Sequence, residues 1–400
     1  MKIGILTLTS RTNLNNGAAL QAWALKTTIA KIAPPPENEV FVLPLDQDPK
    51  EKAYKKYKTK KGVQNIFRYY ISSLIRTIKH NRQIRSANER YLRFENFHLD
   101  NNFNGMQRFF PCEIDEKTKD IDVFVIGSDW VWHLSDKDLN CNPKDLSALS
   151  SIYLGFSPTL CSTQKRIAYA ASQGIIPNKK SSIWKDALKN FSTISVREAE
   201  SRQYLCQNDP SKQIECVVDP TLLLNVEDLR SIESQRKIYD STEGFIALYV
   251  LPSDNTEAIR KYANRLAKLT GLRICNLSWD REFFISEIPS LGNRFGPSEF
   301  LAGIQQSSYL ITNSFHGMVF ASLYHKPFTA FQRQENDFRQ LNLVRLLNLK
   351  ERLLINNGQN EEDPFGKDVN WELVDKNRND AARLSMEFLK RSILDVNSSN

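Results

Sequence analysis

The stretch MKIGILTLTSRTNLNNGAALQAWALKTTIAKI, residues 1–32, decides the fold class of this 400-residue chain. An apolar strand at 2–8 leads into a polar loop at 9–17, and a helix at 18–32 ends before three consecutive prolines. A second apolar strand, EVFVLPL, follows at 39–45. This order of strand, helix and strand is typical of an α/β unit with a parallel sheet.

The same alternation continues along the chain and restarts after Pro220. The first run has further strands expected at 121–127, 166–172, 192–198 and 214–219, and the second has strands at 244–251, 272–278, 309–312 and 327–331. We therefore predict an α/β fold with two Rossmann-like domains facing a cleft, at 1–225 and 240–370, and a terminal helix at 371–400 that packs back on the N-terminal domain. A single large α/β domain is the alternative.

The composition, 41% hydrophobic and 25% charged residues, suits a globular protein and excludes collagen-like, disordered and coiled-coil chains. No apolar run approaches the roughly 18 residues that a membrane span needs. The first residues lack the features of a signal peptide, and the six cysteines form no CxxC pair. We therefore expect a cytoplasmic protein with reduced thiols.

The net charge of +8 is concentrated in one segment. Residues 50–93 hold 14 Lys and Arg against 2 Glu, which is +12 and leaves −4 for the rest of the chain. Apolar residues at 63–78 fall at the spacing of one helical face among these cations. This face either lies on an anionic membrane surface or packs on the N-terminal domain. No nucleic-acid-binding motif accompanies the charge, so we expect no nucleic-acid partner.

Ligands of such sheets bind beyond the carboxyl ends of the strands, so polar residues at those ends are the candidates for a site. In the N-terminal domain they are Asn16 and Gln21 in NLNNGAALQ (13–21), and Ser128, Asp129 and Trp130 in GSDWVWH (127–133). A carboxylate among aromatic residues suits a sugar, but Ser128 or Asp129 could equally cap the next helix. The loop at 9–17 contains no GxGxxG or Walker motif, so the alternative interpretation is that it is an ordinary βα turn.

Cationic candidates follow other strands. Arg197 ends the apolar strand before Glu198, where it either binds a carboxylate or phosphate or simply pairs with Glu198. In ITNSFHGMVFAS (311–322), Ser314 is a predicted N-cap and His316 falls in the first helical turn, a position that favours anions. Arg339 is a further anion candidate and Arg333 a weaker one. His325 needs only a helix-capping role, and DQD at 46–48 is a weak metal motif, so we expect no metal.

Six motifs occur here in the order of a known family: residues 2–25, FVIGSDWVWH (124–133), RIAYAASQG (166–174), ISVRE (194–198), VVDPTLLL (217–224) and YLITNSFHGMVFASLYHKPF (309–328). Together they resemble the polysaccharide pyruvyl transferase family over about residues 1–355. The resemblance implies a glycosyltransferase-B-like (GT-B-like) fold. It also implies transfer of a pyruvyl group from phosphoenolpyruvate (PEP) to two hydroxyls of a sugar in a surface-polysaccharide precursor, forming a ketal and releasing phosphate, with no cofactor.

Within this resemblance the C-terminal domain binds PEP and the N-terminal domain binds a sugar or lipid-linked acceptor. His316 is the expected acid or phosphate ligand, Arg197 holds the anion, and Asp129 is the base. The remaining expected substrate-binding residues are Ser314, Phe315, Gly317, Arg339, Asn16, Gln21, Ser128 and Trp130. Asp219 is interpreted as a structural cap at the hinge. The alternative is a nucleotide-sugar-dependent glycosyltransferase of the same fold, in which Glu335 or Asp337 would bind the ribose; the oligomeric state stays open.

Overall fold

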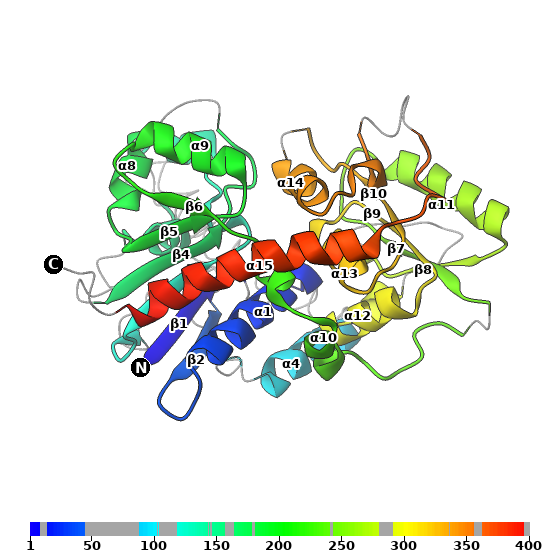
Figure 1. The fold of residues 1–400 in the computed structure, drawn as a ribbon, viewed down its shortest axis with the longest axis horizontal. Coiled ribbons are helices and arrows are strands. Elements are labelled where there is room, and N and C mark those ends of the chain that lie inside the picture. Colours follow the sequence, from blue (N-terminus) through cyan, green and yellow to red (C-terminus); the bar gives the residue numbers. More distant parts are fainter. Residues whose placement is uncertain are drawn as a thin grey trace, which may run out of the picture.

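The computed structural model has two parallel β-sheets, each covered by helices, with a long terminal helix lying across both (Figure 1). The structure describes residues 1–8, 14–44, 88–101, 103, 118–142, 144, 146–156, 164–177, 181–240, 243–279, 291–335, 337–355 and 362–395. The predicted amphipathic face at 63–78, the lysine-rich stretch before it and the DQD motif lie outside these residues. The proposals made for them stay predictions.

The first sheet has the strand order β2-β1-β3-β4-β5-β6, and all its pairings are parallel. Its strands are β1 (Lys2–Thr7), β2 (Glu39–Pro44), β3 (Val123–Gly127), β4 (Lys165–Ala171), β5 (Thr193–Val196) and β6 (Ile214–Cys216). The sequence VFVIG of β3 is buried at every position, as expected for a central strand with helices on both faces. Its main helices are α1 (Asn16–Ile32), α8 (Ser182–Leu188) and α9 (Ala199–Asn208), with shorter turns α6 (Asp136–Leu139) and α7 (Ala148–Tyr153). Helix α4 (Asn88–Asp100) packs against α12 (Pro297–Gln306), beside the second sheet.

The second sheet has the order β11-β10-β9-β7-β8 and is also parallel. Its strands are β7 (Phe245–Tyr249), β8 (Arg273–Asn276), β9 (Tyr309–Thr312), β10 (Phe328–Phe331) and β11 (Leu353–Leu354). The helices beside it are α11 (Thr256–Thr270), α12 (Pro297–Gln306), α13 (Phe315–Leu323) and α14 (Phe338–Leu346). Between the sheets, the chain passes through the 3₁₀ turn η4 (Pro220–Leu223) and helix α10 (Val226–Ile232). The predicted fold of two Rossmann-like domains is confirmed.

The terminal helix α15 (Trp371–Leu394) crosses from the second sheet to the first, as predicted (Figure 1). Near its end, Phe388 packs against Tyr169 of β4, and the Ser385 hydroxyl accepts from the backbone N–H of Val218. At its start, His325 stacks on Trp371, and its Nε2 lies 2.9 Å from a carboxylate oxygen of Asp375. His325 takes a left-handed backbone at the end of α13, where its N–H and that of Lys326 donate to carbonyls of the last turn, so it lies in the helix cap as expected, and its side chain also contacts α15.

Some elements differ from their sequence-based prediction. The strand predicted at 214–219 ends at Cys216, because residues 217–219 leave the sheet and enter η4. Helices α4, α10 and α14 and the short strand β11 were not predicted. Arg90 of α4 lies near the end of the basic segment and has a structural role. Its buried guanidinium donates to the carbonyls of Leu14, Gly292 and Phe295. Among the helices that the structure describes, none is long and apolar enough to cross a membrane.

Candidate active site

A cavity of about 230 Å³ lies between the carboxyl ends of the two sheets. From the side of the first sheet it is lined by Leu8, Asn15, Ala18, Asp129 and Trp130. From the second sheet it is lined by Leu251, Asn313, Ser314, Phe315, His316, Arg333 and Arg339. Strand-end residues of both domains therefore meet in one cleft, which is where doubly wound sheets bind their ligands.

Helix α13 begins at this cleft. Ser314 has an extended backbone, and its hydroxyl accepts from the N–H of Gly317, so the predicted N-cap is confirmed. His316 therefore lies in the first helical turn, directly after β9. The first N–H groups of a helix have no acceptor within the helix, and the helix dipole adds positive potential there. This end of α13 consequently favours an anion.

The His316 ring is held between two parts of the chain that are far apart in sequence. On one side lies Gly17 of α1, where an added Cβ would come within 2.2 Å of His316 Nδ1. On the other side, Nε2 is 3.8 Å from Asp219 Oδ1 and is enclosed without a hydrogen-bond partner. Burial lowers the pKa of His316 and outweighs the opposite effect of Asp219 and Asp129, with Arg197 and Arg339 lowering it further. The ring is thus neutral at pH 7.

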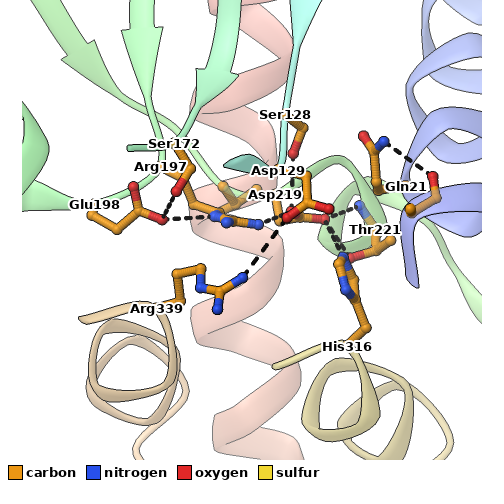
Figure 2. Close-up of polar contacts among 12 residues, drawn as sticks. Gln21, Ser128, Asp129, Ser172, Arg197, Glu198, Asp219, Thr221, His316 and Arg339 are labelled. Carbon is orange, nitrogen blue, oxygen red and sulfur yellow. Dashed lines mark hydrogen bonds and ion pairs between the residues drawn. The ribbon is translucent and has the colours of Figure 1, made fainter. Parts of the chain in front are cut away.

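Asp219 lies at the centre of the polar network (Figure 2). Its Oδ2 accepts from Ser128 Oγ at 3.0 Å and from Arg197 Nη1, while its Oδ1 accepts from the Thr221 N–H and hydroxyl at 3.0 and 2.7 Å. Burial alone would raise the pKa of Asp219, but Arg197 and the hydrogen bonds from Thr221 hold it below its ordinary value. The predicted capping role is confirmed at Thr221, yet it misses that this carboxylate faces His316.

Arg197 does not line the cavity that contains His316. It donates to Glu198 and Asp219, and its guanidinium lies over the Phe315 ring at 4.7 Å from the centroid. It borders a second cavity of about 220 Å³ on the side of α14 and α15, where its Nη2 is buried without a partner. The pairing with Glu198, one of the two roles predicted for Arg197, is therefore present. The hydrogen bonds of Arg197 connect it toward His316 through Asp219.

Arg339 is the guanidinium that faces His316. Two of its nitrogens bind the carboxylate of Asp337, and Nη1 is 3.7 Å from Asp129 Oδ1 (Figure 2). Its guanidinium also covers the Trp130 ring, 4.6 Å from the centroid. Gly174 approaches the same indole so closely that a Cβ there would lie 2.6 Å from it. Trp130 consequently supports Arg339, which covers one face of its ring.

The turn after β3 directs two neighbouring side chains into the site. Ser128 and Asp129 have φ values of 28° and 62°, which non-glycine residues seldom adopt. Such backbone strain is characteristic of functional sites. Asp129 precedes a 3₁₀ turn (Trp130–Trp132) but makes no capping hydrogen bond, and Ser128 binds Asp219. Neither residue therefore has the capping role that was the alternative.

Asn16 and Gln21 do not line the cavity. The Gln21 amide donates to Thr7 Oγ1 and to the carbonyl of Ala18, and Asn16 is fully buried with an amide that has no partner. Their neighbour Asn15, which caps α1, lines the cavity instead. Helix periodicity could have identified Asn15, because the cap position precedes the buried face. Gly317 packs against Thr312 and keeps the first turn of α13 close to β9.

Among the described side chains, no three His, Cys, Asp or Glu residues gather as metal ligands. Two parallel α/β sheets with a polar cleft between them define a protein of the GT-B-like class. A UDP-GlcNAc 2-epimerase from Methanocaldococcus jannaschii, in complex with UDP-GlcNAc and UDP, is similar to this chain with a TM-score of 0.50 and 10% identity, covering 96% of this chain and 93% of its own. This likeness shows the fold alone.

Two further solved structures are less similar. The UDP-N-acetylglucosamine 2-epimerase from Rickettsia bellii has a TM-score of 0.47 at 10% identity, covering 98% of this chain and 99% of its own. The ADP-heptose LPS heptosyltransferase II from E. coli has a TM-score of 0.37 at 10% identity, with coverages of 96% and 99%. No curated protein matches the chain.

The family of this chain is identified by the comparison of its sequence with family models. The model of the polysaccharide pyruvyl transferase family matches residues 15–335, from the start of α1 to the strand-end residues after β10. The chain belongs to this family and is a transferase. The match includes every residue described above around the cavity except Leu8, Asp337 and Arg339.

Proposed function

We propose that this transferase moves the pyruvyl group of PEP onto two hydroxyls of a sugar in a surface-polysaccharide precursor. The observation that carries the proposal is the charge distribution of the cavity. Arg333, Arg339, His316 and the N-terminal end of α13 all lie on its wall from the second sheet, whereas Asp129 faces them from the first. A small donor with a phosphate and a carboxylate needs such a wall, and a hydroxyl that must lose a proton needs a carboxylate opposite.

The proposed donor site follows from comparing the arginines near the cavity. Arg339 is fixed by Asp337, and its Nη1 remains directed toward Asp129 and the cavity. Arg197 was expected to hold the anion, but its nearest partners are Glu198 and Asp219, and it lies outside this cavity. We therefore assign the donor carboxylate or phosphate to Arg339 and to the first turn of α13, with Arg333 at the rim.

The chemistry requires a proton at the methylene carbon of PEP, which leaves an oxocarbenium-like centre at C2. One sugar hydroxyl attacks C2, phosphate leaves, and the second hydroxyl closes the ketal ring. One hydroxyl proton then resides in the new methyl group, and the other leaves with phosphate as HPO₄²⁻. His316 moves the proton on the donor side, and Asp129 takes one from the acceptor. A positioned acid or base of this kind contributes roughly 10²–10⁴ in rate.

The neutral state of His316 fits this cycle. Burial lowers its pKa, so the ring carries no charge while the cavity holds no anion. A nearby negative charge raises a histidine pKa, so binding of the anionic donor favours protonation of the ring. The nucleotide-sugar alternative gains no support from its two ribose-binding candidates, because Arg339 occupies both carboxylate oxygens of Asp337 and Glu335 does not line the cavity.

The test compares donors and identifies the product. Phosphate release is measured with PEP, and UDP release with UDP-sugars, against galactosides and N-acetylhexosamines, and mass spectrometry detects the pyruvylated or glycosylated acceptor. We expect release from PEP only, and its loss in His316→Ala and Arg339→Ala. His325→Ala and Arg265→Ala are matched controls, because these residues form comparable pairs with Asp375 and Asp363 away from the cavity. Sugar transfer from a UDP-sugar, or full activity of His316→Ala, would refute the proposal.

A further inference from the structure

The two nitrogens of the His316 ring have different surroundings. Nε2 is enclosed and points to Asp219, and Nδ1 lies at Gly17, where α1 reaches the cavity (Figure 2). A neutral histidine carries its proton on only one of these atoms, and the hydrogen bond made by one nitrogen decides which. The atom that is left without a proton is the one able to exchange a proton with a ligand.

Asp219 requires that the groups facing it be donors. Each of its four hydrogen-bond partners, namely Ser128 Oγ, Arg197 Nη1 and the N–H and hydroxyl of Thr221, donates to it. The carboxylate is completely buried, which by itself would raise its pKa, but Arg197 and the hydrogen bonds from Thr221 hold the pKa below its ordinary value and keep the group ionised. A bare ring nitrogen directed at this negative charge would be repelled, whereas an N–H would be attracted.

We propose that Asp219 is a positioning residue for His316: its carboxylate keeps the ring proton on Nε2, so that Nδ1 is the atom that exchanges a proton with the ligand in the cleft. The role of Nδ1 rests on the proposed function, but the position of the ring proton does not. The separation of 3.8 Å between Nε2 and Oδ1 is longer than a hydrogen bond, and such catalytic contacts commonly shorten when substrate binds.

Asp219 and His316 are held by different domains. Asp219 is fixed from the first sheet by Ser128 after β3 and Arg197 after β5, whereas His316 belongs to α13 beside the second sheet. Arg197 thus helps to position His316 indirectly, by holding Asp219. The charged groups that influence the ring are Asp219 and Asp129, which raise its pKa, and Arg197 and Arg339, which lower it; α1 contributes only the uncharged Gly17 at this point.

The test reads the ring directly, without substrate. The full chain is labelled with ¹⁵N-histidine, and the ring nitrogens of His316 are assigned by their loss in His316→Asn. We expect the wild type at neutral pH to show a protonated Nε2 and a bare Nδ1. A proton on Nδ1, or an even mixture of the two forms, would overturn the proposal whatever the donor substrate is.

Asp219→Asn then tests the cause. The new amide must place an NH₂ group against donors, so the proton of His316 redistributes, and the titration midpoint of the ring falls by about 1–3 pH units because a neighbouring negative charge is lost. Asp375→Asn is the matched control, because it alters the other His–Asp pair and changes only the signals of His325. A folded Asp219→Asn protein with an unchanged His316 tautomer and midpoint would refute the assignment.

Two features keep the outcome interpretable. If circular dichroism shows that Asp219→Asn does not fold, Thr221→Val removes a single donor from Oδ1 and shifts the His316 signals less, and the wild-type tautomer still decides the proposal. Phosphate release from PEP is measured separately on the wild type. Failure of that reaction with the predicted tautomer intact refutes the proposed function and leaves Asp219 as the residue that positions the ring.

Discussion

Gly17→Ala is the smallest change that displaces His316. The added Cβ would lie 2.2 Å from Nδ1, 2.7 Å from Cγ and 3.0 Å from Cε1 of the ring. Nonbonded heavy atoms settle at about 3.5 Å, so the ring must withdraw by more than about 1 Å. The first of these atoms is the one assigned to proton exchange, so the displacement acts directly on the reacting geometry.

The expected loss follows from that distance. A misplacement of about 1 Å at a reacting group costs on the order of 10²-fold in rate, which corresponds to about 2.7 kcal/mol in the transition state. Stability should change little, because alanine gains about 1 kcal/mol over glycine in a helix while overpacking costs roughly 1–3 kcal/mol. Initial rates of phosphate release give kcat/KM, and thermal unfolding shows whether the fold is kept.

Gly303→Ala is the matched control. Gly303 also lies in a helix, α12, and an added Cβ there would come within 2.8 Å of Leu277; neither residue lines the cavity. This variant should show a similar packing cost with kcat/KM close to that of the wild type. If Gly17→Ala keeps kcat/KM within a factor of about 3, less than 1 kcal/mol, the ring does not depend on this contact and the reasoning fails.

Two further predictions concern charge. Arg339→Lys loses the two-pronged contact with Asp337 and the cover on Trp130, so the KM for PEP should rise about tenfold or more in initial-rate measurements; an unchanged KM would remove Arg339 from the donor site. Burial lowers the pKa of His98 to about 4, so the unfolded chain binds the extra proton as the pH falls through 6.5. The contribution of His98 to the free energy of unfolding is therefore fully present above pH 6.5, and about 3 kcal/mol of it is lost as the pH falls to 4. In urea unfolding, His98→Phe should not show this part of the loss.

The order of strands and helices could be predicted because parallel strands buried on both faces leave continuous apolar runs in the sequence. VFVIG at 123–127 and YLIT at 309–312 are such runs, and both strands lie where they were expected. Helices without this signal were missed. In α4 the deciding residue is Arg90, whose burial depends on carbonyls of Leu14, Gly292 and Phe295, and no local pattern contains those partners.

The candidate site was predicted in part. A residue directly after a parallel strand must lie at the ligand-binding edge, and His316 and Asp129 line the cavity there, whereas Arg197 does not. The edge does not say to which side of the cleft a side chain turns, and Arg197 turns toward Phe315 and the second cavity. That choice depends on Asp219, a partner 22 residues later in the chain.

The contact of Asp219 with His316 was not predicted, because the local sequence already accounts for an aspartate at this position. An aspartate before a proline is a good cap, and the Thr221 N–H confirms that role. One carboxylate, however, can accept several hydrogen bonds, so satisfying the turn leaves Oδ2 for Ser128 and Arg197 and one side of Oδ1 facing His316. Since Ser128 and Arg197 belong to the first sheet and His316 to the second, the 3.8 Å gap changes with the separation of the two domains. A change in that separation would therefore act on the nitrogen that we propose Asp219 keeps protonated.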